Sequence, residues 1–259
     1  MSTARFFLFA FGFTFSLQFP AALARMGVLS GDPDAYLPLA TLGIFGPLVA
    51  ATWLTYRERG RAGVRALFRG LVDLRVPMRW AIAALFVPAG LLSLGLLAMR
   101  AAGYQGAWHH LPGVPQLWVA LVVSVAEEVG WRGFALPRLI DKYGAFLGSC
   151  MLGGLWALWH VPMFIAAGIP MSLSLVMLLF FVGGSLYFTF LYQKARGSLL
   201  VAVLAHLGAH LNNSHAALPA DTLPLLVHTV VYASLGLATM RRAAFHAPVP
   251  TQRASAHAL

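Results

Sequence analysis

Long apolar runs separated by short loops that carry arginine dominate this 259-residue sequence. Hydrophobic residues make up 59% of the chain and charged residues only 10%, an apolar excess that no soluble domain of this size needs. Inside a bilayer every backbone polar group must be hydrogen-bonded within the protein, so apolar runs of about 20 residues predict transmembrane helices. The sequence therefore predicts an all-α, polytopic membrane protein.

About eight runs of this kind follow one another along the chain. They cover residues 6–24, 36–56, 80–99, 117–136, 145–167, 172–192, a run that begins at Ser198, and 223–240. The first run also resembles a secretory signal peptide that ends at Ala24, but its apolar stretch is longer than the usual signal core of 7 to 15 residues. We therefore expect about eight transmembrane helices.

The basic residues predict the orientation of these helices. The formal net charge is +10, and if both termini are cytoplasmic, all but Arg25 and Arg100 of the 18 Lys and Arg residues lie on that side. This is the positive-inside pattern, so the charge indicates membrane topology and not a nucleic-acid partner. We expect a multi-pass protein of the bacterial inner (plasma) membrane with both termini in the cytoplasm.

Seven of these 18 basic residues lie in the loop of residues 57–79, which also carries an apolar stripe. The stripe has the spacing of an amphipathic helix and consists of Val64, Leu67, Phe68, Leu71 and Val72. Such a helix would suit an anionic leaflet. A solvated loop with chance periodicity is the alternative.

Two adjacent glutamates and an arginine interrupt the run of residues 117–136. The glutamates fall about 15 Å along this helix at 1.5 Å per residue, where an unpaired charge costs roughly 2.5 kcal/mol or more. Glu128 and Arg132 are four residues apart and can pair along one helix face, whereas Glu127 has no intrahelical cationic partner. Glu127 is therefore predicted to be the carboxylate left free for chemistry.

Histidines lie at matching depth in two later runs. His160 is followed by Pro162, and His206 and His210 are one helical turn apart in the next but one run. A single intramembrane histidine can simply hydrogen-bond a neighbouring helix. Polar groups in three runs together predict a shared intramembrane catalytic cavity.

Zinc accepts the donor atoms of these side chains, although their spacing does not identify a zinc site. The set would consist of Glu127, His160, His206 and His210. The metal is thus left unknown, with either no cofactor or a divalent ion such as zinc.

The same residues resemble the CAAX-protease and bacteriocin-processing (CPBP, Abi) intramembrane endopeptidases, which include the type II prenyl-protein proteases. The family motif EExxxR is matched by Glu127, Glu128 and Arg132, and FxxxH is matched by His160 with Trp156 in place of phenylalanine.

The third family motif, HxxxN or HxxxD, is matched only in part. His206 aligns, but His210 occupies the fourth position, and the nearest asparagines are Asn212 and Asn213. The resemblance covers roughly residues 115–214.

The resemblance implies an intramembrane endopeptidase that acts on a membrane-associated or lipidated peptide or protein. It implies that Glu127 and His160 activate water and that Glu128 with Arg132 orients the site. It assigns His206 with His210 to the oxyanion.

The apolar runs and the resemblance together divide the chain into four parts. Residues 1–114 form N-terminal helices with the basic loop, 115–214 the catalytic core, 215–245 the last transmembrane helix and 246–259 a disordered tail.

A buried Glu, His and Arg set could instead line the path of a proton-coupled transporter, or belong to a non-catalytic membrane partner such as an immunity protein. The transporter alternative lacks a visible inverted repeat.

Overall fold

The computed structural model describes residues 3–105, 113–211 and 223–240, and every regular element in these ranges is helical. Asn212, Asn213 and the predicted tail of residues 246–259 lie outside them. The helices are α1 (Thr3–Arg25), α2 (Leu37–Leu42), α3 (Gly46–Arg69), α4 (Met78–Ala101), α5 (Val114–Gly130), α6 (Leu136–Ala166), α7 (Ser174–Lys194), α8 (Leu199–His210) and α9 (Leu223–Met240). Short 3-10 turns η1 (Pro33–Tyr36), η2 (Gly43–Phe45) and η4 (Met171–Leu173) precede α2, α3 and α7, and the π-turn η3 (Trp131–Ala135) joins α5 to α6.

Five helical stretches in the described part of the chain are long and apolar enough to cross a membrane. They cover Thr3–Arg25, Pro33–Arg69, Met78–Ala101, Val114–Ala166 and Met171–Lys194, and the apolar helices α8 and α9 are shorter. The all-α fold of a multi-pass membrane protein is thus confirmed. The number of eight spans stays a prediction.

Two glycines divide the longest stretches. Gly144 in α6 has a φ of 77° and Gly60 in α3 a φ of 60°, both in the left-handed region that side chains disfavour. The chain folds back after Gly144. This is seen from Gly148, where a Cβ would lie only 3.0 Å from the carbonyl carbon of Leu139. The sequence expectation of separate runs before and after residue 144 agrees with this break.

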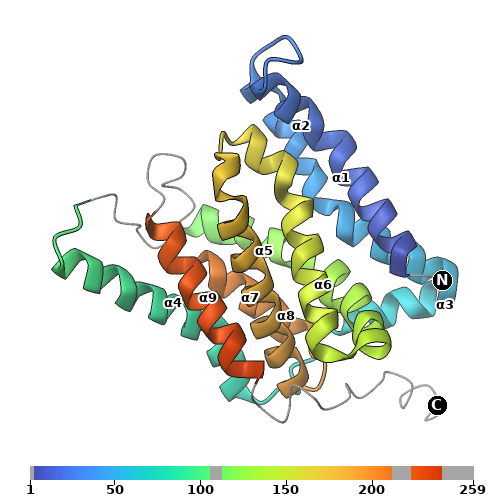
Figure 1. The fold of residues 1–259 in the computed structure, drawn as a ribbon. Coiled ribbons are helices and arrows are strands. Elements are labelled where there is room, and N and C mark those ends of the chain that lie inside the picture. Colours follow the sequence, from blue (N-terminus) through green and yellow to red (C-terminus); the bar gives the residue numbers. More distant parts are fainter. Residues whose placement is uncertain (1–2, 106–112, 212–222, 241–259) are drawn as a thin grey trace.

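The helices form a central group with a flank on each side (Figure 1). In the centre, α5 packs on α8, α8 on α7 and α7 on α6. On one side, α1 packs on α6 and α3 on α5, whereas on the other side α4 packs on α8 and α9 on α7. The central helices are those that carry the predicted site.

The basic loop of residues 57–79 is helical as far as Arg69, so Leu71 and Val72 of the predicted stripe lie beyond the end of the helix. Leu67 is buried against the bundle, whereas Arg61 and Arg65 are exposed on the opposite face. The amphipathic helix is confirmed, although its stripe is shorter than expected because Val72 is 71% exposed.

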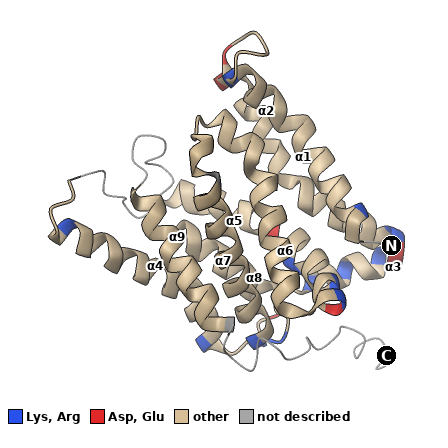
Figure 2. Cartoon of the chain, in the orientation of Figure 1, with Lys and Arg blue, Asp and Glu red and all other residues tan. Residues whose placement is uncertain are grey.

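Charged residues are unevenly placed in the fold. Figure 2 shows most Lys and Arg at the end of the bundle that carries the N-terminus and the bend of α3. This is the asymmetry on which the predicted orientation rests.

A close backbone contact holds α5 against α3. A Cβ at Gly130 would lie 2.7 Å from the carbonyl oxygen of Pro47, a distance that backbone atoms do not tolerate. The small side chain lets the two helices approach, as is common between membrane helices.

We therefore expect Gly130→Ala to lower the free energy of unfolding by about 1–3 kcal/mol, the usual cost of overpacking. Thermal unfolding of the purified protein in detergent measures this effect. Gly12→Ala is the matched control, because a Cβ at Gly12 meets no atom within 4 Å in the described structure. Equal stability of the two variants would contradict the assigned contact.

Candidate active site

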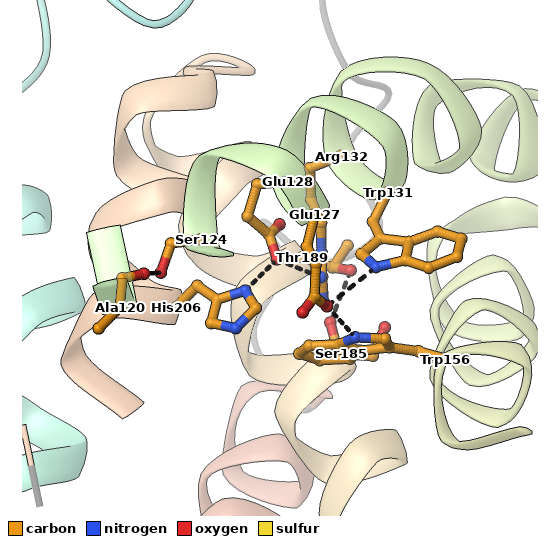
Figure 3. A network of polar contacts seen from close by, with 10 residues as sticks. All are labelled: Ala120, Ser124, Glu127, Glu128, Trp131, Arg132, Trp156, Ser185, Thr189 and His206. Atoms are coloured by element: carbon orange, nitrogen blue, oxygen red, sulfur yellow. Dashed lines mark hydrogen bonds and ion pairs between the residues drawn. The ribbon is translucent and has the colours of Figure 1, made fainter. Parts of the chain in front are cut away.

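Predicted polar residues from α5, the π-turn η3 and α8 come together at the centre of the bundle, and Figure 3 shows four of them, Glu127, Glu128, Arg132 and His206. Helix α5 contributes Glu127 and Glu128, η3 contributes Arg132, and α6 and α8 contribute the histidines. Glu127, Glu128 and Arg132 are buried, with exposed fractions of 2%, 0% and 0%. Charge buried to this degree must be paired or used.

Glu128 is shared by two partners. Its Oε1 accepts a hydrogen bond from Arg132 Nη1 at 2.8 Å and another from His206 Nδ1 at 2.9 Å. The pair with Arg132 has the predicted i, i+4 spacing, whereas His206 lies 78 residues away. Glu128 therefore fixes both the arginine and the first histidine of α8.

Two aromatic rings complete the surroundings of Arg132. Its guanidinium carbon lies 4.6 Å from the ring centroid of Trp156 and 4.9 Å from that of Phe188. Nε and Nη2 of Arg132 and Oε2 of Glu128 make no hydrogen bond among the described residues. Cation–π contacts, worth about 2 kcal/mol when desolvated, thus partly replace the missing hydrogen bonds of Arg132.

Glu127 is held by two indoles. Its Oε2 accepts hydrogen bonds from Trp131 Nε1 at 3.2 Å and from Trp156 Nε1 at 2.6 Å. Within the described residues Glu127 makes no ion pair, as its spacing predicted. The indoles orient the carboxylate while its Oε1 makes no hydrogen bond within the same residues.

The sequence did not identify the two indoles as hydrogen-bond partners of Glu127. Trp131 is four residues after Glu127, the spacing that identified the pair of Glu128 and Arg132. Trp156 occupies the position of phenylalanine in the second motif, and phenylalanine carries no ring N–H donor. This departure from the motif therefore adds a hydrogen bond to Glu127.

The π-turn places these side chains. Residues Trp131–Ala135 form it directly after the glutamates, with the helical chain continuous on both sides. An inserted π-turn widens a helix locally and is frequent at functional sites. Here it carries Trp131 toward Glu127 and Arg132 toward Glu128 at the same time (Figure 3).

His160 has a defined tautomer. Its Nδ1 lies 2.8 Å from the carbonyl oxygen of Trp156, which can only accept, so Nδ1 donates. Its Nε2 in the neutral ring is then an acceptor. The ring packs on Phe164 and Phe181, with centroids 5.4 and 4.4 Å away.

His206 and His210 stack one turn apart on α8. Their ring centroids are 5.2 Å apart and their planes differ by 8°. The structure therefore brings His210 to the site.

A cavity of about 300 Å³ lies against these residues. Four of the six predicted residues line it, namely Glu127, His160, His206 and His210, whereas Glu128 and Arg132 lie behind its wall. Most of the remaining lining is apolar, with aromatic side chains from α6 and α7. A few convergent polar groups in an apolar pocket are typical of a binding site.

The four lining residues do not form a metal site. No group of three or more His, Cys, Asp or Glu side chains in the described ranges is close enough together to hold a metal ion. The residues present thus do not fit the zinc set that atom types alone allow.

Comparison with known proteins agrees with these motifs. The family described as type II CAAX prenyl endopeptidase, Rce1-like, matches residues 109–212. The chain is also 26% identical over 241 residues to "CAAX prenyl protease 2" of Methanococcus maripaludis, an alignment that covers 84% of this chain and 86% of that protein. The matched range contains all six predicted site residues. Over residues 109–212 the chain is thus similar to the Rce1-like type II CAAX prenyl endopeptidases, a family of proteases.

Proposed function

We propose that this protein hydrolyses a peptide bond of a lipidated or membrane-associated peptide by means of a water molecule activated by Glu127 and His160. The observation that carries the proposal is that Glu127 lines the cavity and has no cationic partner in the described structure, while Glu128 takes the arginine. A buried carboxylate without a counter-charge has no structural need in a membrane helix. It has an evident use as a general base.

The proposed reaction follows the available atoms. Water held between Glu127 and the Nε2 acceptor of His160 attacks the carbonyl carbon of the substrate, and its proton passes to Glu127 Oε1. The C–N bond then breaks, and Glu127 returns the proton to the leaving amine. The indoles keep Oε2 in place throughout, since both hydrogen bonds are to that oxygen.

His206 is proposed to stabilise the oxyanion. Its Nδ1 donates to Glu128, so the ring is oriented by a carboxylate that Arg132 already holds. The protonated ring would donate Nε2–H to the developing charge, and one such donor is worth roughly 3–4 kcal/mol. His210, stacked on this ring, would supply the second donor.

The substrate class follows from the relative and from the cavity. The Methanococcus maripaludis protein is named a prenyl protease. The apolar, aromatic lining of the cavity here suits a lipidated chain in the same way. We propose a peptide or protein with a lipid anchor as substrate, with the bilayer as the solvent of that anchor.

The test is turnover of a library of lipidated and unlipidated peptides by the reconstituted protein, with new fragments detected by mass spectrometry. We expect fragments from a lipidated subset. A proton-coupled transporter or a non-catalytic partner would produce none, so their absence across the library would overturn the proposal.

The topology proposed above can be tested by cysteine labelling. The chain has one cysteine, Cys150, which is replaced by serine before a new cysteine is introduced at Ala62, Ser255 or Ser30. We expect Ala62→Cys and Ser255→Cys to react only from the cytoplasm and Ser30→Cys from the outside, because of the positive-inside rule. Labelling of position 62 or 255 in intact cells would refute the orientation.

His210→Asn tests the departure from the third motif. Asparagine also donates one hydrogen bond but does not titrate, so we expect most activity to remain and the change in rate between about pH 5 and 8 to become smaller. The kcat/KM profile over that range measures this. The same profile with a chelator shows whether activity depends on a bound metal. An unchanged profile would show that His210 only packs against His206.

A further inference from the structure

Gln18 is a buried polar residue in the largely apolar helix α1, and the helix would form without it. It lies thirteen residues after Arg5, about 20 Å along the helix at 1.5 Å per residue. Its exposed fraction is 1%. This helix lies outside the range that the family comparison matches.

Only one end of the Gln18 amide is satisfied. Nε2 lies 3.4 Å from the carbonyl oxygen of Ala40. That oxygen can only accept, so the amide nitrogen must be the atom that faces it. The amide oxygen Oε1 is buried and makes no hydrogen bond within the described residues. An unsatisfied buried acceptor costs about 1–3 kcal/mol.

The surrounding contacts keep the side chain in this orientation. A Cβ at Gly43 would lie 2.9 Å from Gln18 Cγ, which shows how closely η2 covers the side chain. One turn earlier, Thr14 Oγ1 donates to Gly43 O at 2.7 Å and accepts from Trp159 Nε1 at 2.8 Å. Helix α1 is therefore tied to η2 and α6 beside Gln18.

Gln18 lines the same cavity as Glu127, His160 and His206. It comes from the wall formed by α1, whereas the glutamate and the histidines come from α5, α6 and α8. A peptide that enters this apolar cavity must find acceptors for its backbone N–H groups, because unpaired ones are costly.

We propose that Gln18 positions the substrate by accepting a hydrogen bond from a backbone N–H of the bound peptide. The proposal rests on the proposed peptidase function and adds a residue outside the matched core to its binding site. The bond is formed only when peptide is present, and it satisfies Oε1 at the same moment as the peptide N–H. Gln18 is a positioning residue, since the reacting atoms belong to Glu127 and the histidines.

Replacing single backbone amides of the peptide by esters removes one N–H at a time and tests this bond. The probes are farnesylated peptides that end in Cys-Val-Ile-Ala, with each amide after the cysteine replaced in turn. Binding is measured in the Glu127→Gln background, so that hydrolysis does not interfere. The proteins compared carry Gln18, Gln18→Met or Thr14→Val.

With Gln18 present, one of the esters is expected to bind about tenfold more weakly than the amide peptide, as loss of one net hydrogen bond predicts. With Gln18→Met the amide peptide should lose about the same factor, and that ester should bind no worse than the amide. Thr14→Val disturbs the same helix contact without removing Oε1, so it should keep the ester-specific loss. If Gln18→Met does not fold, Gln18→Leu replaces it.

Three outcomes would overturn the proposal. These are equal ester losses with Gln18 and with Gln18→Met, loss of the ester effect in Thr14→Val, and failure of every peptide to bind the protein that carries Gln18. Fragment production by the wild-type protein is measured separately. Cleavage without an ester effect thus rejects Gln18 alone, and binding with the ester effect but without cleavage rejects only the peptidase.

Discussion

Glu127→Gln is expected to lower kcat for peptide hydrolysis by about 100- to 10,000-fold, the usual contribution of a general base. The amide keeps the size of the carboxylate, and its oxygen can still accept from Trp131 and Trp156, so folding should be unaffected. The measurement is single-turnover cleavage by purified protein in liposomes, together with thermal unfolding.

Glu58→Gln is the matched control. Glu58 is also a helical glutamate with a close partner, since its Oε2 accepts from Arg138 Nη2 at 2.7 Å, but it does not line the cavity. We expect turnover close to that of the wild type. Turnover of Glu127→Gln at the same level as this control would remove Glu127 from the reaction.

Arg132→Met is expected to have the largest effect on stability. It leaves the fully buried carboxylate of Glu128 with His206 but without the arginine, and removal of one member of a buried ion pair costs about 3–5 kcal/mol. The loss of the contacts with Trp156 and Phe188 acts in the same direction. Denaturant unfolding in mild detergent measures the difference.

The double variant Glu128→Leu with Arg132→Met separates charge from packing. It buries no charge, so most of the lost stability should return, because buried ion pairs can often be replaced by apolar side chains of similar volume. Activity should stay low, since His206 loses the carboxylate that orients it. Wild-type stability of Arg132→Met alone would show that the pair contributes little to the fold.

Local features of the site could be predicted because helix geometry depends on spacing alone. The pairing of Glu128 with Arg132 needed only the i, i+4 rule and an apolar run long enough to be helical. The bond from Trp131 to Glu127 follows the same rule and could have been found in the same way. The amphipathic helix was confirmed for the same reason, except where the chain leaves the helix after Arg69.

Apolar runs predicted where helices lie better than where they end. A hydrogen-bonded helix continues through charged residues as readily as through apolar ones, so α3 runs on past the apolar stretch to Arg69. It bends at Gly60, as α6 turns at Gly144, because glycine adopts positive φ without steric cost. Hydropathy does not report this property.

By itself the sequence determined the helical class, the order of the polar segments and the residues proposed to carry the chemistry, since each of these depends on composition or on short spacing. Only the tertiary structure decided which partners they meet. His206 reaches Glu128 across 78 residues, Trp156 reaches Glu127 across 29, and Gln18 enters the cavity from a helix with no motif. Such contacts depend on how helices pack, and packing is set by many small side-chain contacts at once, which no local pattern encodes.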